Sequence, residues 1–416
     1  MPVHAERVEA PEYGLDWPGP KGSKFAISDQ VSRPERLEGT ALAQWVTMRP
    51  SKRKIRYAVV GVGHIAQVAV LPAFEHASSN SQLVALVSSD AKKRRVLSKR
   101  YGLEHTSTYA GLERLIHDAQ IDAVYLATPN HTHRELTIRA MAAGAHVLCE
   151  KPMAMTVDDC QAMLDASKQY SRKLMIAYRL HFEEATLKAI DAARSGKLGN
   201  LRYFSSSFSH QIRRGDIRTK AKDGGGALAD LGPYPINAVR NLFGADPISV
   251  FAWKAMNVDS RSEDVDEMTT AILRFSDQRL AQITVSQGSA DVGGYRVVGT
   301  KGDLRVEPAF EYRGTRAHHV TVNAKRRDTT YGPGDQFAPE LIAFSECILN
   351  DTIPEPSGEE GMADVRVLEA IAQSASSGLP VMLAPHERKR PPPLKQVMHK
   401  PPVRKSRLVH TRSPSV

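Results

Sequence analysis

A parallel α/β domain followed by an α+β domain is the fold that the 416-residue sequence predicts. The apolar run Ile55–Val60 ends in the pattern Gly61-x-Gly63-x-x-Ala66, which indicates a buried strand, a tight turn and a helix. Segments of strand and helix character then alternate to residue 178, as in a Rossmann domain with a parallel sheet. After residue 200 several strands follow one another without helices between them, which predicts a large, mostly antiparallel open sheet.

The glycine turn carries the first functional signal. Gly61 allows the tight turn, Gly63 allows the main chain to approach a pyrophosphate, and Ala66 occupies the third, packing position. The helix that follows offers unpaired N–H groups to an anion. We therefore expect Gly61, Gly63, His64 and Ile65 to bind a dinucleotide, although glycines occur in many strand-to-helix turns and the pattern alone is weak.

The other elements of the first domain follow from apolar runs of strand length and from longer segments of helical character. Strands are expected at 82–87, 121–127, 146–149 and 173–178, and helices at 91–101, 109–117, 132–143 and 156–170. The dinucleotide-binding domain is therefore assigned to residues 52–178, preceded by an arm with many turn-forming residues at 1–51.

The second domain, residues 179–383, begins with a helix at 182–194 and continues mainly with strands. Strands are expected at 201–208, 248–253, 267–275, 280–285 and 295–300, and further helices at 233–243, 337–349 and 361–376. Helices would cover one face of this sheet, and the open face is a natural surface for a second copy of the chain. A homodimer formed through the C-terminal sheet is therefore expected.

The net charge of +10 is concentrated at one end of the chain. Residues 384–416 hold nine Lys and Arg residues and a single Glu, a net charge of +8, and they are also rich in proline. This composition predicts a disordered, solvated tail. A weak contact with nucleic acid or another anionic surface is the alternative, but a function in nucleic-acid binding is not expected when the charge is confined to such a tail.

The sequence argues against membrane, secreted, disulfide-rich and zinc-binding proteins. The sequence has no stretch of about 18 apolar residues, so no membrane span is expected. Its first ten residues lack the basic and apolar regions of a secretory signal, which favours the cytoplasm. The cysteines Cys149, Cys160 and Cys347 have no spacing typical of a disulfide framework or a zinc site, so we expect buried thiols and no metal.

The end of the second strand indicates which dinucleotide is bound. A carboxylate there would bind the ribose 2′-hydroxyl of NAD, but the strand runs into two serines, Asp90 and three cations. Serine and cationic side chains suit a 2′-phosphate, which favours NADP and assigns Ser88, Lys93 and Arg94 to its binding. NAD stays possible because Asp90 could serve the ribose, and the cations could equally be a solvated helix start.

Polar residues also follow the third and fourth strands, where a doubly wound sheet binds its ligand. Lys151 could polarise a hydroxyl or carbonyl oxygen or share its proton, although a surface lysine is the alternative. His131 and His133 lie near the start of a helix, where histidines are more often capping or solvent-facing groups than ligands. The residues assigned to the cofactor at these two strand ends are Thr128, Pro129, Asn130, His133, Glu150 and Lys151.

Four motifs in register carry a resemblance to a known family. They are Gly61–Ala66, Ala127–His133, Glu150–Ala154 and Gly224–Tyr234. Their order and spacing over residues 52–383 resemble the glucose-fructose oxidoreductase / inositol dehydrogenase / MocA family. Many members carry histidine where this chain has Tyr234, and tyrosine there is typical of the glucose-fructose oxidoreductase type.

The resemblance implies a mechanism. Tyr234 would be the acid/base on a sugar or polyol hydroxyl, Lys151 would position the nicotinamide and assist proton transfer, and Asp230 would orient substrate hydroxyls or tune Tyr234. Cofactor contact is also implied for Arg179, and a place in the substrate pocket for Arg179 and His181. A hydride would pass to the nicotinamide, giving a lactone from an aldose, and the Lys151–Pro152 bond is expected to be cis. The N-terminal arm would reach across the cofactor and aid tetramer assembly.

One departure from the family pattern concerns residues 213–223, which lack a tryptophan and are shorter than in glucose-fructose oxidoreductases. Enclosure of the cofactor is therefore left open. Two other functions also stay open. One is a non-catalytic, cofactor-binding regulator of the same fold, and the other is an NAD-dependent glycosidase that uses transient hydride transfer.

Overall fold

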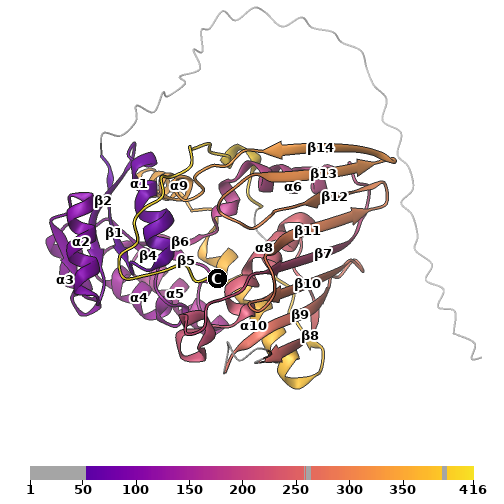
Figure 1. Cartoon of the computed structure of the whole chain (residues 1–416), viewed down its shortest axis with the longest axis horizontal. Helices are drawn as coiled ribbons and strands as arrows, with labels where there is room; N and C mark the ends of the chain where they lie inside the picture. Colours follow the sequence, from indigo (N-terminus) through magenta and orange to yellow (C-terminus); the bar gives the residue numbers. More distant parts are fainter. Residues whose placement is uncertain (1–52, 257, 259–263, 387–390) are drawn as a thin grey trace, which may run out of the picture. The chain divides into compact units, whose positions relative to one another are not determined.

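The structure is a computed structural model that describes residues 53–256, 258, 264–386 and 391–416 (Figure 1). The arm expected at residues 1–51 lies outside the described residues. The fold class predicted from the sequence is confirmed, with a parallel sheet in the first domain and a larger, mostly antiparallel sheet in the second.

The first domain is built on six parallel strands in the order β3-β2-β1-β4-β5-β6. The strands are β1 (Ile55–Val60), β2 (Ser81–Val87), β3 (His105–Ser107), β4 (Ala123–Leu126), β5 (His146–Glu150) and β6 (Leu174–Ala177). All of them except β3 were expected, and β3 has only three residues, all polar. The strand order reverses between β1 and β4, so the carboxyl ends of these two strands open a crevice.

Helices flank this sheet, and local capping explains where they begin and end. They are a π-helical turn, Ala66–Val70, with α1 (Leu71–His76), then α2 (Ala91–Tyr101), α3 (Leu112–Asp118), α4 (His133–Ala142) and α5 (Val157–Gln169). Asp90 caps α2 by accepting from the Lys93 main-chain N–H, and left-handed Gly102 ends the same helix.

The second domain contains nine strands in the order β14-β13-β12-β11-β7-β10-β9-β8-β15, in which β7 and β10 are parallel and the other pairs antiparallel. The strands are β7 (Leu201–Ser209), β8 (Ser249–Met256), β9 (Asp266–Arg274), β10 (Leu280–Ser286), β11 (Val292–Gly299), β12 (Gly302–Val306), β13 (Arg316–Val322), β14 (Lys325–Tyr331) and β15 (Val381–Met382). The last four were not predicted, because they are short or, as in β14, mostly charged and polar.

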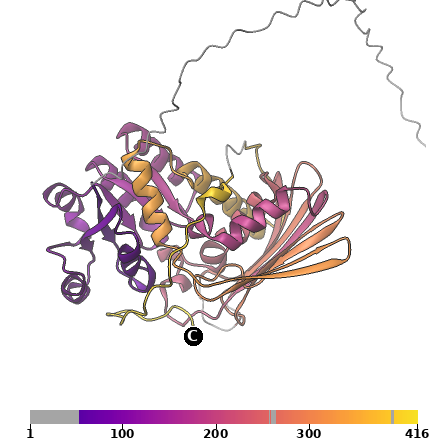
Figure 2. The ribbon, with the colours of Figure 1, turned by 90° about the horizontal axis from the view of Figure 1, so that it is seen from above.

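Helices cover one face of the nine-stranded sheet, as Figures 1 and 2 show. These helices are α6 (Glu184–Arg194), α7 (Ala227–Leu231), α8 (Pro233–Phe243) and α10 (Gly358–Ser377). The helix α9 (Ala338–Leu349) packs instead against α1, β1 and β2 of the first domain. Side chains of the sheet alternate between the apolar core of the second domain and the opposite face. That opposite face exposes large side chains from five neighbouring strands: Tyr203, Trp253, Met268, Ile272, Leu280 and Val292.

The C-terminal segment differs from the disordered tail expected for residues 384–416. Within it, residues 391–416 run along the body of the protein and make specific contacts with it. Val409 is buried, Met398 and Leu408 pack against the core of the first domain, and the main-chain N–H of Asp335 donates to the Lys400 carbonyl. A few apolar side chains and main-chain hydrogen bonds therefore order a segment that composition alone assigns to solvent.

The cysteines agree only in part with the sequence prediction. Cys149 and Cys160 are buried thiols as predicted, whereas Cys347 is half-buried. Across the part of the chain that the structure describes, no helix is both long and apolar enough to cross a membrane.

Candidate active site

The glycine turn has the geometry that a phosphate group requires. Gly61 has a φ of +88°, and a Cβ there would lie 2.5 Å from the Ala127 carbonyl oxygen, so only glycine fits. A Cβ on Gly63 would meet nothing within 4 Å, which leaves the main chain open to a ligand. The buried Gln67 side chain donates to the Val62 carbonyl at 2.9 Å and holds the turn in this shape. The turn therefore fits a dinucleotide pyrophosphate.

This turn forms one end of a cleft of about 890 Å³ between the carboxyl edge of the parallel sheet and the second domain. The volume lies within the range of about 300–1,000 Å³ that small-molecule and cofactor sites occupy. Most of the site residues predicted from the sequence line it: Gly61, Gly63, His64, Ile65, Ser88, Lys93, Thr128, Pro129, Asn130, Glu150, Lys151, Arg179, Asp230 and Tyr234.

Three predicted site residues do not line this cleft, and the first is Arg94. Its guanidinium turns back and donates to the main-chain carbonyl of Ser88, which makes it a support for the end of β2. The second, His133, is fully buried, and its ring nitrogens lie 2.9 Å from the Pro152 carbonyl and 3.1 Å from the Thr128 carbonyl. His133 thus joins the ends of β4 and β5 and does not face the cofactor.

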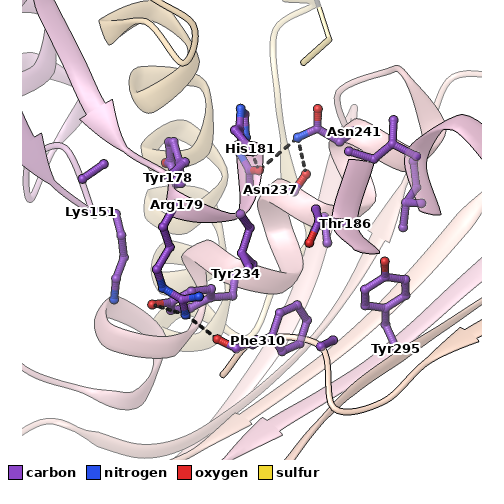
Figure 3. Close-up of a pocket in the computed structure, with 16 residues that line it drawn as sticks. Lys151, Tyr178, Arg179, His181, Thr186, Tyr234, Asn237, Asn241, Tyr295 and Phe310 are labelled. Atoms are coloured by element: carbon purple, nitrogen blue, oxygen red, sulfur yellow. Dashed lines mark hydrogen bonds between the residues drawn. The ribbon is translucent and has the colours of Figure 1, made fainter. Parts of the chain in front are cut away.

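The third is His181, which lines a smaller apolar cavity of about 30 Å³ behind the cleft (Figure 3). Its Nδ1 lies 3.0 Å from Glu355 Oε1 and its Nε2 lies 2.8 Å from Asn237 Oδ1. Burial lowers the pKa of this imidazole, but Glu355, Glu360 and Asn237 together outweigh that effect, so the net pKa is raised. His181 therefore contributes to the packing behind the site.

The residues after β2 favour a 2′-phosphate over a bare ribose. Ser88 is buried at the cleft, and Lys93 lines the same end. The Asp90 carboxylate has both oxygens engaged, one by the Lys93 main-chain N–H at 2.9 Å and the other by His410 Nδ1 at 3.0 Å. The hydrogen bond from the Lys93 N–H is the largest of the effects that lower the Asp90 pKa. Asp90 is therefore a helix cap, and the reason for keeping NAD open is weakened.

Lys151 stands at the other end of the cleft, immediately after β5. Its Nζ donates to the main-chain oxygen of Asp230 at 2.9 Å and lies 3.6 Å from Asp230 Oδ1. The same Nζ is 4.7 Å from the centre of the Tyr234 ring. The Lys151–Pro152 peptide bond is cis, as expected. The fold thus brings together Lys151, Asp230 and Tyr234, the three residues that the sequence motifs predicted to act in catalysis.

A second cation lies beside the same phenol. The Arg179 Nη2 donates to the Tyr234 hydroxyl at 3.3 Å, and its guanidinium carbon is 5.2 Å from the ring centre. Figure 3 shows the amino group of Lys151 and the guanidinium of Arg179 both directed toward Tyr234. Phe208 and Phe310 pack against the ring, with centroids 5.3 and 5.9 Å away. The phenol is therefore fixed in place, with positive charge on two sides.

Asp230 is held as a carboxylate by the cations around it. Its Oδ2 lies 3.1 Å from Arg218 Nε, and Gln287 Nε2 lies 3.4 Å from the same oxygen. Burial would raise the pKa of Asp230, but Arg218 first, then Lys151 and His210, lower it to about 2. Asp230 thus supplies the counter-charge that orients Lys151 beside Tyr234.

Arg218 was missed by reasoning from the sequence. It belongs to a 3₁₀ turn, Ile217–Thr219, in the segment that departs from the family pattern. Gly225 packs against this turn so closely that a Cβ there would lie 2.3 Å from the Arg218 carbonyl oxygen. The available signal was the basic segment Arg213–Lys222, which ends shortly before the triple glycine motif.

Two further carboxyl groups, those of Glu150 and Glu340, lie close enough to each other to interact electrostatically. Glu150 accepts from the Tyr125 hydroxyl at 2.8 Å, and burial raises its pKa. Glu340 is fully buried, and neither of its carboxyl oxygens has a hydrogen-bond partner among the residues that the structure describes. Burial, with Glu150 nearby, raises the pKa of Glu340 well above its ordinary value. The buried position of Glu340, close to Glu150, therefore disfavours its charged form.

Comparison with known sequences agrees with this geometry. Residues 55–178 match the profile of an oxidoreductase family with an NAD-binding Rossmann fold, and residues 191–383 match the C-terminal alpha/beta domain of the same family. The D-xylose 1-dehydrogenase [NADP(+)] of Haloarcula marismortui is 29% identical over 351 residues, covering 82% of this chain and 96% of that protein. A second NADP(+)-dependent D-xylose 1-dehydrogenase, from Haloferax volcanii, is 30% identical over 331 residues, or 79% of this chain and 99% of that protein.

Solved structures give the same picture. The aldose-aldose oxidoreductase from Caulobacter crescentus, complexed with glycerol, has a TM-score of 0.76 and 36% identity and covers 80% of this chain and 100% of its own. A 3-ketoreductase from Actinomadura kijaniata, in complex with NADP and TDP-benzene, has a TM-score of 0.71 and 29% identity, covering 77% of this chain and 98% of its own. With its fold, glycine turn and both domains matched, the chain belongs to the Gfo/Idh/MocA family of oxidoreductases.

Proposed function

We propose that this protein is an NADP-dependent oxidoreductase that transfers a hydride between a CH–OH carbon of a sugar or polyol and the nicotinamide ring. Oxidation of an aldose to its lactone is the reaction favoured here. The relatives named above that act on xylose or aldoses support this substrate class. The observation that carries the proposal is the Tyr234 phenol placed between Lys151 and Arg179 in the cleft that begins at the glycine turn.

The bound dinucleotide would supply the hydride acceptor, and the side chains would manage the proton. As a phenolate, Tyr234 takes the proton of the substrate hydroxyl while the C–H electron pair leaves as hydride and the carbon becomes a carbonyl. Lys151 and Arg179 stabilise the phenolate and the oxygen charge that develops in the transition state. Asp230 touches Lys151 and Arg218, so its role is to position the lysine.

The choice of NADP rests on the chain's own residues. Ser88 and Lys93 line the end of the cleft where a 2′-phosphate would be bound, and Asp90 is engaged as a helix cap. The Ser88 hydroxyl and the Lys93 ammonium group are hydrogen-bond donors, as the oxygens of a phosphate require. Binding of NADPH should therefore be tighter than binding of NADH.

The test combines cofactor titration with substrate screening. We would titrate NADPH and NADH by fluorescence and then screen aldoses and polyols for reduction of NADP⁺. Reduction by at least one aldose supports the proposal. Bound cofactor that no sugar or polyol reduces would point to a regulator, and hydrolysis of an aryl glycoside without net cofactor reduction would point to a glycosidase.

We also propose that the open face of the nine-stranded sheet joins copies of the chain into a homodimer or homotetramer. Its exposed tyrosine, tryptophan and aliphatic side chains support this assignment, because apolar surface of that extent is commonly an interface. The cytoplasm is the proposed compartment, since Cys149, Cys160 and Cys347 are free thiols, which a reducing compartment maintains.

A further inference from the structure

The last residues of the chain line the same cleft as the glycine turn. Thr411, Arg412, Ser413, Pro414 and Ser415 all contribute to the wall of the 890 Å³ cleft. They lie beyond residue 383, where the match to the family's C-terminal domain ends. This part of the cleft is therefore built by a segment outside both matched domains.

One end of the segment is clamped to the glycine turn. The Gln67 amide donates to the Val409 carbonyl at 3.0 Å and accepts from the Val409 N–H at 2.8 Å. Gln67 is fully buried and also donates to Val62 within the turn. The next residue, His410, lies 3.0 Å from the Asp90 carboxylate at the 2′-phosphate end of the cleft. A single amide thus couples the phosphate-binding turn to the C-terminal segment.

The other end of the segment is fixed to the second domain. The Arg213 N–H donates to the Pro414 carbonyl at 2.7 Å, and the Arg213 side chain donates to the Ser415 carbonyl at 2.8 Å. The Val416 N–H donates to the Gln211 carbonyl at 3.0 Å, completing a short antiparallel pairing around Ile212 and Ser415. Residues 409–416 therefore span the cleft from one domain to the other.

The segment also brings a cation to the cleft. Arg412 lines it, and within the residues that the structure describes its guanidinium has no hydrogen-bond or ion-pair partner. Guanidinium groups bind phosphate in two-point geometry, and the hydroxyls of Thr411 and Ser413 on either side are hydrogen-bond donors. Charge and position together suit the phosphate-bearing part of a dinucleotide.

We infer that residues 409–416 form part of the dinucleotide site, in which Arg412 binds a cofactor phosphate and the bridged segment slows cofactor exchange. The inference rests on the proposed use of NADP and adds a binding element to it. Exchange is slowed because Arg412 holds a cofactor phosphate and because hydrogen bonds at both ends keep the segment in place across the cleft.

The experiment measures NADPH binding, with no sugar present. Three variants are compared with the full chain: a protein that ends at Leu408, Val409→Asp, which displaces the segment by burying a charge, and Arg412→Ala. The equilibrium constant comes from NADPH fluorescence, and the dissociation rate from stopped-flow displacement by excess NADP⁺. Arg404→Ala is the matched control, because it removes an equal charge from an exposed tail position outside the cleft.

Truncation and Val409→Asp should each raise the Kd and the dissociation rate about tenfold or more, and Arg412→Ala should raise the Kd about tenfold. The control should match the full chain. Equal Kd and dissociation rate for the full chain and the truncated protein would overturn the inference, even if sugars are oxidised. Failure of the full chain itself to bind NADPH would instead refute the proposed function.

Discussion

The Tyr234 hydroxyl is the atom on which the proposed chemistry depends. Arg179 donates to it at 3.3 Å, and Lys151 lies 4.7 Å from the ring centre, so removing the oxygen removes the proton acceptor but leaves the cations in place. We predict that Tyr234→Phe lowers kcat about 10²–10⁴-fold, as loss of a general base does.

The Kd for NADPH should be unchanged in Tyr234→Phe, because the phenol is expected to act on the substrate. Steady-state kinetics and cofactor titration of the same preparation separate the two effects. A variant that keeps its full kcat would exclude Tyr234 as the base.

The contribution of the Asp230 carboxylate to stability should depend on pH. Its pKa is lowered from 3.8 to about 2, so the native carboxylate contributes stability above pH 3.8 and loses it as the pH falls toward 2. Asp230→Asn should therefore lower the free energy of unfolding by about 2 kcal/mol near neutral pH. The difference from the unmodified protein should vanish in acid.

Urea unfolding across the acidic range measures this difference. Asp351→Asn is the control, because its ion pair with Lys173 is exposed to solvent and should contribute little to stability. A difference between Asp230→Asn and the unmodified protein that stays constant with pH would contradict the assigned titration.

The helices α8 and α10 are joined by a buried cluster of charged side chains around Arg240. Arg240 is fully buried and forms ion pairs with Asp246, Glu360 and Asp364. We predict that Arg240→Met lowers the free energy of unfolding by about 3–5 kcal/mol, because it leaves buried carboxylates without their cation.

Denaturant unfolding of Arg240→Met checks this value, and Arg240→Lys should recover only part of the loss, since a lysine cannot make the same forked contacts. Unfolding at the same denaturant concentration as the unmodified protein would show that the cluster contributes no net stability.

Elements with clear start and stop signals were predictable from the sequence, whereas short polar strands were not. The helix at 91–101 and the helix at 233–243 have the predicted bounds because a cap or proline starts each and glycine follows. The strand β14 was missed because its residues are mostly charged, and pairing with β13 forms it. Patterns of apolar residues indicate which segments are buried, and the edge strand β14 has no buried residue.

The site shows the same limit. Lys151, Asp230 and Tyr234 could be nominated because each lies in a motif of fixed spacing. Arg218 and the segment 409–416 could not, because their roles arise from contacts between residues far apart in the chain. Composition described the segment's solubility but not the few hydrogen bonds that hold it.

In the whole molecule, the open face of the nine-stranded sheet exposes large apolar side chains that a second copy of the chain would cover. Trp253 and Ile272 are 60% and 45% exposed on strands β8 and β9. We predict that Trp253→Arg combined with Ile272→Arg yields a monomer, since two charges would have to be buried at the interface.

Light scattering coupled to size-exclusion chromatography measures the mass. Replacing Lys325 and Arg327 of the edge strand β14 by Ala, two changes away from those exposed aromatic and aliphatic side chains, should leave the assembly intact. If the unmodified protein is a monomer at all concentrations, the proposed interface is wrong.

In the proposed reaction, a hydride leaves a sugar carbon in this cleft while Tyr234 takes the proton of the substrate hydroxyl. An aldose carrying deuterium at its anomeric carbon, incubated with NADP⁺ and the protein, tests it by mass spectrometry of the reduced cofactor. We expect the deuterium to appear in NADPH with the unmodified protein, and we expect its transfer to be slowed about 10²-fold or more in Tyr234→Phe. Absence of label in the cofactor with every aldose tried, or equal transfer by the two proteins, would contradict it.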